Sequence, residues 1–236
     1  MRLATVTAAT DAPATDADIV LMPGRAAYMP ARATLLVADL HLGKAATFRS
    51  QGIPVPEGSA QKDLARLIDL VAATAAGRLI VLGDLFHARS GCTEEVFAEF
   101  TAARGRFPET EVILVAGNHD RSVGRLPPGI GIDSVFRTHD EPPFHFVHEP
   151  GTPLPEPDRD EPYTLAGHLH PTIAIKSPSG DRLVDRCFVA ETGLLVLPAF
   201  GSFTGGHRMT PSEEARVWIA RDDGVAEVTR LVQQAR

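Results

Sequence analysis

The sequence has very little cysteine. Among 236 residues there are only two, Cys92 and Cys187, and they do not form a Cys-x-x-Cys pair. This scarcity argues against a disulfide framework and against a structural zinc site built on thiolates. Two thiols in a chain of this length are expected to stay free in a reducing compartment, so we expect a cytoplasmic protein. Neither cysteine is expected to be catalytic.

Long apolar runs are also missing. Threonines, Asp11 and Asp16 interrupt the N-terminal residues, which is unlike the apolar block of a signal peptide. No run approaches the length that crosses a membrane, so no membrane association is expected. Residues 1–17, rich in Ala, Thr and Asp, are expected to form a flexible leader, followed by a single domain over residues 18–236.

Positive charge is in short supply as well. Thirty acidic residues outnumber 23 Lys and Arg, which gives a formal net charge of −7. This balance argues against a broad basic face that holds nucleic acid by neutralising its phosphates. Any affinity for phosphate must therefore be local, and a pair of bound divalent ions would supply it by concentrating positive charge at one spot.

Strand and helix signals alternate in the first half of the chain. Buried strands are predicted immediately before Asp39, Asp84 and Asn118. Helices are predicted over residues 59–76, with Ser59 as N-cap and Gly77 as the stop, and over 93–105. No helix or strand is predicted between 43 and 58. Beyond residue 119, short apolar runs broken by Gly and Pro predict mostly antiparallel strands, including one at 225–232. We expect an α/β fold in which helices cover a mixed sheet and a second sheet packs on the first.

Polar side chains follow the predicted strands, where each strand ends. They are Asp39, His41, Asp84, Asn118, His148, His168 and His170. Carboxylate, amide and imidazole ligands suit Mn²⁺, Fe²⁺ or Zn²⁺. Seven ligands are too many for one ion but divide between two that share a bridging carboxylate. Such a pair would hold the attacking and leaving oxygens of a phosphoryl transfer and lower the pKa of a shared water, so that no Ser or Cys nucleophile is needed.

These motifs resemble those of the calcineurin-like metallophosphoesterases. Asp39-x-His41, Gly83-Asp84, Gly117-Asn118-His119-Asp120, His148 and Gly167-His168-x-His170 follow the family's order at similar intervals across residues 35–170. The resemblance implies the αββα architecture, with two packed mixed sheets flanked by helices. It also implies the roles of the site residues: Asp39, His41 and His170 hold one metal, Asn118, His148 and His168 hold the other, and Asp84 bridges them. His119 is then the general acid or a hydrogen-bond donor to the leaving oxygen. Where the family usually has glycine after the histidine at 148, this chain has Glu149 and Pro150.

A narrower resemblance is to the ligase-associated DNA damage response endonucleases, the PdeM subfamily. It lies in residues 38–44, 52–56, 82–88, 148–150 and 197–206. It implies a manganese-dependent phosphodiesterase or endonuclease acting on single-stranded DNA in DNA repair. It also implies a functional link to a DNA ligase, an exonuclease and an Lhr-type helicase.

Several further residues are weighed against an ordinary structural role. His87 could support a metal ligand or touch substrate, or be a hydrogen-bonded structural histidine. Lys44 and Arg49 could steer a phosphate or be solvated loop charges. Phe203, in the glycine-rich segment 200–207, could stack on a base or fill the core. His139 and His145, which belong to no motif, are expected to have no role in function.

Three alternatives to the endonuclease hypothesis remain. The same scaffold could serve a phosphomonoesterase or nucleotide hydrolase. It could be the nuclease core of the larger double-strand-break enzymes, which the missing DNA-capping domain disfavours. It could also be a metal-free scaffold that only binds partners, which the intact ligand set disfavours.

Overall fold

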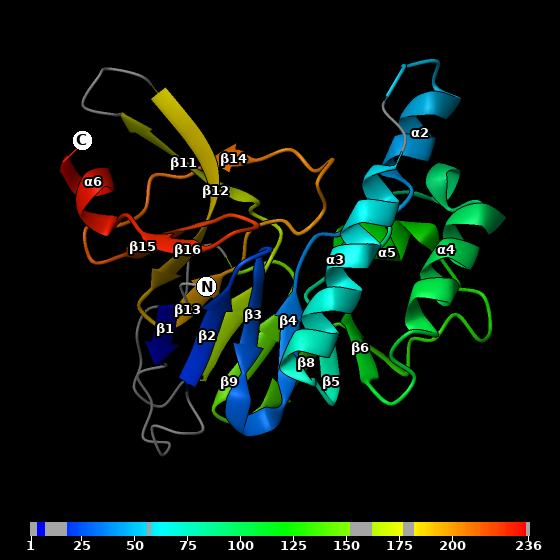
Figure 1. Cartoon of the computed structure of the whole chain (residues 1–236), viewed down its shortest axis with the longest axis horizontal. Coiled ribbons are helices and arrows are strands. Elements are labelled where there is room, and N and C mark those ends of the chain that lie inside the picture. Colours follow the sequence, from blue (N-terminus) through cyan, green and yellow to red (C-terminus); the bar gives the residue numbers. More distant parts are fainter. Residues whose placement is uncertain (1–3, 8–17, 56–57, 152–161, 177–181, 235–236) are drawn as a thin grey trace.

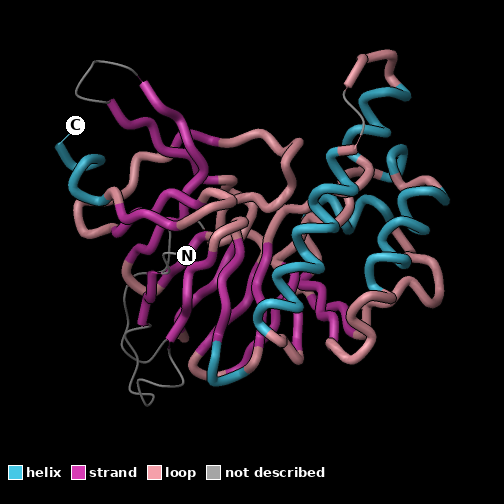
Figure 2. The backbone as a smooth tube through the Cα atoms, viewed as in Figure 1, coloured by secondary structure: helices cyan, strands magenta, loops and turns pink. Residues whose placement is uncertain are grey.

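The computed structural model describes residues 4–7, 18–55, 58–151, 162–176 and 182–234. Two mixed sheets pack face to face, and helices cover their outer faces (Figures 1 and 2). The four layers are the αββα arrangement expected for this chain.

Among the described residues, the strands of the first sheet lie in the order β1-β2-β3-β4-β5-β6-β7. Strands β1 to β4 pair antiparallel and β4 to β7 pair parallel. Their bounds are β1 Ala4–Thr7, β2 Asp18–Met22, β3 Ala26–Met29, β4 Thr34–Val37, β5 Arg78–Val81, β6 Glu111–Val115 and β7 Ser134–Phe136. Because β4, β5 and β6 are parallel neighbours, their carboxyl ends meet at one edge of the sheet.

The second sheet has the described order β14-β11-β12-β13-β10-β9-β8, with β15 and β16 attached through β12. Its strands are β8 Thr138–Glu141, β9 Phe144–Val147, β10 Tyr163–Ala166, β11 Pro171–Lys176, β12 Arg182–Glu191, β13 Leu194–Val196, β14 His207–Arg208, β15 Arg216–Ala220 and β16 Val225–Glu227. Strand β10 pairs parallel with β9 and β13, whereas β12 pairs antiparallel with its neighbours.

Most of the described helices lie beside the first sheet, on the right in Figure 1. The helical segments are η1 Pro30–Arg32, α2 Lys44–Ser50, α3 Ser59–Thr74, η2 Arg89–Gly91, α4 Glu94–Arg104, α5 Asn118–Val123 and α6 Thr229–Gln234. The C-terminal helix α6 instead covers the outer face of the second sheet through Val232.

Side-chain alternation along the strands separates the hydrophobic layers. Leu36, Ile80 and Ile113 are in register on β4, β5 and β6 and face the second sheet, where Phe188 and Trp218 are fully buried. Burying each such large side chain contributes about 1.5–3 kcal/mol. On the outer face of the first sheet, Leu64 and Leu67 of α3 and Phe100 of α4 pack against the strands. The parallel strands are buried on both sides, which explains their continuous apolar sequence.

Four local expectations were wrong. Residues 4–7, placed in a loose leader, form β1 and pair with β2, while 8–17 lie outside the described residues. Residues 44–50, where no element was expected, form α2. Helix α3 has Gly58 as its N-cap and ends at Thr74, with Ala75 in the left-handed conformation, so Ser59 and Gly77 are not its caps. The strand expected over 225–232 is the short strand β16 followed by α6.

The predicted ends of helix α4 are confirmed. Its N-cap is Thr93, whose hydroxyl accepts a hydrogen bond from the Val96 N–H, and Gly105 is its C-cap.

Both cysteines are free. Within the described part of the chain, every helix is too short or too polar to cross a bilayer.

Candidate metal centre

The predicted ligands gather at the ends of five strands, three from the first sheet and two from the second. Asp39, Asp84 and Asn118 follow β4, β5 and β6, and His148 and His168 follow β9 and β10. The face-to-face packing of the sheets brings the two edges together. Residues separated by more than a hundred positions therefore share one site.

The backbone at this site is unusual. Asp39, His41, Asp84, His168 and His170 have φ between 44° and 66°, and they are five of the eight described non-glycine residues with positive φ. Each such conformation costs of the order of 1–3 kcal/mol and persists only where the surroundings fix it. The strain turns the chain sharply out of each strand and aims these side chains into the site.

The first group of ligand atoms comes from Asp39, His41, Asp84 and His170, one from each residue, all within 4.8 Å of one another. Nε2 of His41 lies 3.3 Å from Nε2 of His170, which in turn lies 3.3 Å from Oδ1 of Asp39. That Oδ1 is buried and makes no hydrogen bond within the described chain. A buried carboxylate oxygen without a donor is costly. Its cost is removed if a cation lies among these atoms, so the donor set fits a divalent ion.

The second group comes from Asp84, His148 and His168. The Nδ1–H of His148 donates to the carbonyl of Leu82 over 3.0 Å, which leaves Nε2 as the ligand nitrogen. Nε2 lies 3.0 Å from Nδ1 of His168 and 3.4 Å from Oδ2 of Asp84. Oδ1 of Asn118 lies 3.1 Å from the same nitrogen and completes the group.

Asp84 belongs to both groups. Its Oδ1 accepts a hydrogen bond of 2.9 Å from the backbone N–H of His119. Its Oδ2 faces His148 and, at 3.8 Å, Nε2 of His41. The carboxylate therefore stands between the two sets of donors, as a bridging ligand must.

The electrostatics keep key donors in their ligand forms. Burial lowers the pKa of His41 to about 2, so its imidazole is neutral near neutral pH. Burial alone would raise the pKa of Asp84, but the hydrogen bond and charge of His148, followed by His41, lower it to about 2. Burial and then the charge of His148 lower the pKa of His168. In His148 burial is outweighed by Asp84 and Asp39, which raise its pKa, so metal and proton compete for its Nε2.

His119 lies at the rim of the centre on α5, with about a third of its side chain exposed. Its Nδ1–H donates to the carbonyl of His87, so its Nε2 is directed toward the centre, 3.9 Å from Oδ2 of Asp84. A group that reaches substrate needs this combination of fixed orientation and access.

His87 supports this arrangement from behind. Its ring stacks on His119, with centroids 4.8 Å apart, and its Nδ1 lies 3.2 Å from Nδ1 of His41. Burial, followed by the charges of Lys44 and His119, lowers its pKa to about 4. Nitrogens of His41, His87 and His119 also cluster, but Nδ1 of His119 already serves the His87 carbonyl. His87 thus contacts both a predicted ligand and the predicted acid.

Two contributors were missed by sequence reasoning. Phe48 of α2 stacks on His87 and makes an edge contact with Phe203. Nothing in the local sequence marks Phe48, because α2 itself was not expected. Buried Asp120 accepts hydrogen bonds from the N–H groups of Phe86 and Gly117 and so ties two site loops together. Its signal was available, since an acidic residue three positions after Gly117 suits a helix N-terminus.

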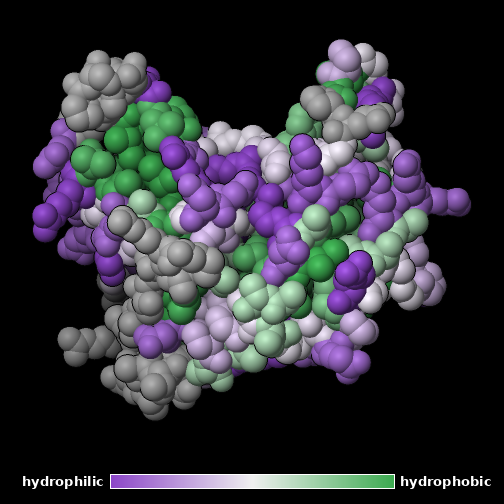
Figure 3. Space-filling model, viewed as in Figure 1, coloured by the Kyte–Doolittle hydropathy of each residue, from purple (hydrophilic) through white to green (hydrophobic). Residues whose placement is uncertain are grey.

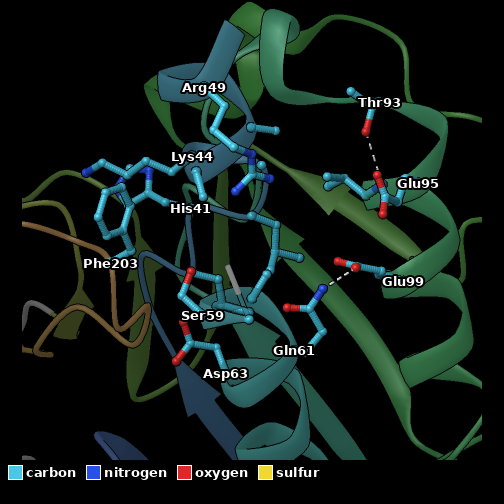
Figure 4. A pocket seen from close by; sticks show the side chains of 18 of the residues that line it. His41, Lys44, Arg49, Ser59, Gln61, Asp63, Thr93, Glu95, Glu99 and Phe203 are labelled. Atoms are coloured by element: carbon cyan, nitrogen blue, oxygen red, sulfur yellow. Dashed lines mark hydrogen bonds between the residues drawn. The ribbon is translucent and has the colours of Figure 1, made fainter. Parts of the chain in front are cut away.

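The structure brings Lys44, Arg49 and Phe203 together beside the metal centre (Figure 4). They line a pocket of about 400 Å³ between α2, α3 and α4, which also contains His41. In the close-up, Lys44, Arg49 and Phe203 lie on the side of His41, opposite Glu95 and Glu99. Burial lowers the pKa of Lys44, and so does the charge of Arg186.

His139 and His145 lie apart from these groups, as expected. His139 of β8 hydrogen-bonds Glu141, and His145 of β9 pairs with Asp140.

This chain is similar to a known protein family and to several solved structures. A family model described as calcineurin-like phosphoesterase matches residues 33–209. Nuclease MPE of Pseudomonas putida is 34% identical, with a TM-score of 0.76 over 96% of this chain and 100% of that chain. Two solved structures have weaker similarity. Yfce, a phosphoesterase from E. coli, is 15% identical over 83% of this chain and 98% of its own, with a TM-score of 0.42. AQ665 of Aquifex aeolicus, a protein of unknown function, is 19% identical over 58% of this chain and 78% of its own, with a TM-score of 0.40. A comparison with curated protein sequences finds no match.

Proposed function

Because this chain belongs to the calcineurin-like phosphoesterase family and is a metal-dependent phosphoester hydrolase, we propose that it is an endonuclease with two metal ions that cleaves single-stranded DNA. One observation carries the proposal: two groups of ligand atoms meet at a single carboxylate, Asp84. The likeness to a nuclease along the full chain favours a nucleic-acid substrate.

The proposed roles follow the two groups. Asp39, His41 and His170 would hold one ion, and Asn118, His148 and His168 would hold the other. Asp84, which belongs to both groups of ligand atoms, would be shared between them. When bound, two divalent ions supply Lewis acidity and activate water at neutral pH, so the protein itself needs no nucleophile.

The protein's own contribution is orientation and proton transfer. The His87 carbonyl accepts a hydrogen bond from Nδ1–H of His119 and so fixes the ring with Nε2 toward the centre. When the imidazole carries a second proton, on Nε2, that nitrogen can pass it to the departing alcohol oxygen and leave the ring neutral. The backbone N–H of His119 holds Oδ1 of Asp84, so the bridging carboxylate and the acid are positioned by one residue. Lys44 and Arg49 orient phosphates next to the scissile one, and Phe203 with Phe48 offers an aromatic surface for an unpaired base.

Manganese is our choice of native metal, because a mixed carboxylate, amide and imidazole set suits it and the sequence resembles manganese-dependent repair endonucleases. We further propose that the enzyme works in the cytoplasm, in DNA repair, alongside a DNA ligase, an exonuclease and an Lhr-type helicase. The free thiols are consistent with that compartment.

Circular single-stranded DNA provides the test, since only an endonuclease can open it. Purified protein with Mn²⁺ should linearise the circles, and Asp84→Asn protein should not. A nucleotide hydrolase on the same fold would leave the circles intact while releasing phosphate from small nucleotides. That result would replace the nuclease proposal.

A further inference from the structure

A second pocket lies on the other side of the loop that carries Phe203. Its volume is about 480 Å³, and its polar lining includes Arg25, Arg186, Arg221, Thr172 and Thr204. Arg25 comes from the turn between β2 and β3, and Arg221 follows β15. The two turns are joined by the hydrogen bond from the Gly24 N–H to the Arg221 carbonyl, and they lie together near the centre of Figure 1. Hydrophilic residues gather on the surface in the same central region of Figure 3.

Arg25 is the unusual member of this pocket. The residue is only 8% exposed, and its Nε is buried without a hydrogen-bond partner in the described chain. Its ion-pair partner is Asp222, at 3.4 Å, whose side chain is 75% exposed. Its backbone has a φ of 70°, a conformation that favours glycine. A long charged side chain is thus held in a strained turn with its donors incompletely used.

The charges around Arg25 do not compensate it. Burial and then the neighbouring Arg66 and Arg186 lower the pKa of Arg25 to about 10, against the smaller opposing effects of Asp222 and Asp63. Arg186 also has a lowered pKa, chiefly through burial. Asp185 lines the pocket too, but it already accepts the Arg221 Nε–H over 2.6 Å. The pocket therefore holds three guanidinium groups and two carboxylates. Of the carboxylates, Asp185 is paired with Arg221, and Asp222 lies mostly in solvent.

Two polar residues, Thr172 and Thr204, line the pocket beside the arginines. Guanidinium groups gathered around one cavity are the donors that recognise a tetrahedral oxyanion.

We propose that this second pocket is an anion site that binds a phosphate group, carried either by the nucleic-acid strand beyond the scissile bond or free in solution. The strand form rests on the function proposed above, whereas the free-anion form does not. Arg25 supplies a guanidinium group whose Nη2 pairs only with solvent-exposed Asp222, and Arg186 and Arg221 complete the positive lining.

The pocket is one loop away from the metal centre. Arg186 donates to the carbonyls of Ala199, Ser202 and Thr204, at 3.3, 3.1 and 2.6 Å. The same segment is also hydrogen-bonded to the metal centre. The Gly201 N–H donates to the Asp39 carbonyl, and the His207 N–H donates to the His170 carbonyl. A strand that occupies the metal centre can thus extend across the loop and place a further phosphate in the pocket.

Three variants of the full-length, metal-loaded protein test the proposal. Arg25→Gln removes the positive charge of this guanidinium group. Asp222→Asn removes the acidic competitor and leaves the pocket more positive. Arg216→Gln removes an exposed arginine paired with Glu227 outside the pocket and serves as the charge-matched control. Sulfate, a stand-in for phosphate that does not precipitate manganese, is titrated calorimetrically into each protein, and thermal unfolding checks that each is folded.

We expect Arg25→Gln to weaken sulfate binding at this site about tenfold, the loss of one charge-assisted donor. Asp222→Asn should tighten it, and Arg216→Gln should leave it unchanged. Unchanged binding in Arg25→Gln, or weaker binding in Asp222→Asn, would overturn the proposal, because the arginines would then be structural partners of the nearby aspartates. This arm needs no nuclease activity.

A labelled single-stranded oligonucleotide separates the two sources of phosphate. Its binding is measured by fluorescence anisotropy against salt concentration, on a His119→Ala background to suppress cleavage. If the strand supplies the phosphate, Arg25→Gln weakens binding and lowers the slope of log affinity against log salt by about 0.7. If only the sulfate response changes, the pocket takes a free anion.

Discussion

Gly83 and His148 are in contact so close that a Cβ added to Gly83 would lie 2.1 Å from Nδ1 of His148. The same glycine has a φ of +76°, which side chains other than hydrogen rarely allow. The glycine before Asp84 thus lets the imidazole reach the Leu82 carbonyl and present its Nε2 to the centre.

Gly83→Ala should therefore displace His148 and weaken metal binding about 10- to 100-fold, as losses of ligand orientation do. Gly77→Ala, where an added Cβ meets nothing within 4 Å, is the matched control at the start of the same strand. Metal content after dialysis against limiting Mn²⁺ measures the effect. Equal retention of metal by both variants would contradict it.

Asp84→Ala should abolish activity and metal pairing together. Both ions lose their shared anion, and their mutual repulsion is no longer offset. Elemental analysis and turnover of a chromogenic phosphodiester measure the two effects. A variant that kept two tightly held ions and normal turnover would remove Asp84 from the bridging position.

His119→Ala should leave the metal content unchanged and slow cleavage, most of all for esters with poor leaving groups, because proton donation matters most where the departing oxygen is basic. The measurement is kcat/KM for phosphodiesters that differ only in leaving-group pKa. If good and poor leaving groups are slowed equally, His119 is not the acid.

Phe203→Ala should reduce kcat/KM on single-stranded DNA about tenfold, the loss of one base stacked on an aromatic ring, and spare a small chromogenic diester. Phe136→Ala, which truncates an exposed phenylalanine on β7, is the control. An equal loss on both substrates would show that Phe203 only supports the fold.

The ion-pair network around Glu141 makes stability depend on pH. Arg32, Arg78 and His139 surround this carboxylate. Burial would raise the pKa of Glu141, but hydrogen bonds from Arg78 and His139 outweigh it and lower the pKa. A lowered folded-state pKa stabilises the fold above the unfolded pKa, and this contribution is lost as the pH falls through the folded pKa.

Glu141→Gln should therefore cost about 1–2 kcal/mol in the free energy of unfolding at pH 7. The difference from the parent protein should begin to shrink below about pH 4.3. Urea unfolding across that range measures it. A difference that stays constant would show that the charge of Glu141 is irrelevant.

The sequence was most informative where chemistry and local pattern coincide. Asp39, Asp84 and Asn118 each follow a short, continuously apolar run, and parallel strands necessarily bring such ends together. The resemblance to the metallophosphoesterases implied that His148 and His168 lie with Asn118, and the structure brings their nitrogen and oxygen atoms together. The left-handed backbone at Asp39 and Asp84 was not predicted. Asp, Asn and His adopt it more often than other side chains do, but still too rarely for residue type alone to predict it.

Long-range contacts account for what local pattern missed. Helix α2 is short, and part of its support is the contact of Gly43 with Gly91, where an added Cβ would lie 2.3 Å from a carbonyl oxygen. Isolated helices of this length are marginal, so tertiary packing decides. Residues 225–232 were predicted to be one strand, but the structure has the short strand β16 there and then helix α6. The arginine pocket joins Arg25 to Arg186 and Arg221 across most of the chain, which no local pattern could reveal.

The central claim is that two cations are held around Asp84. Anomalous diffraction from crystals of the manganese-loaded enzyme tests every assigned ligand at once. We expect two peaks, one beside Asp39, His41 and His170 and the other beside Asn118, His148 and His168, with Asp84 touching both. A single peak, or peaks held by other side chains, would contradict the account.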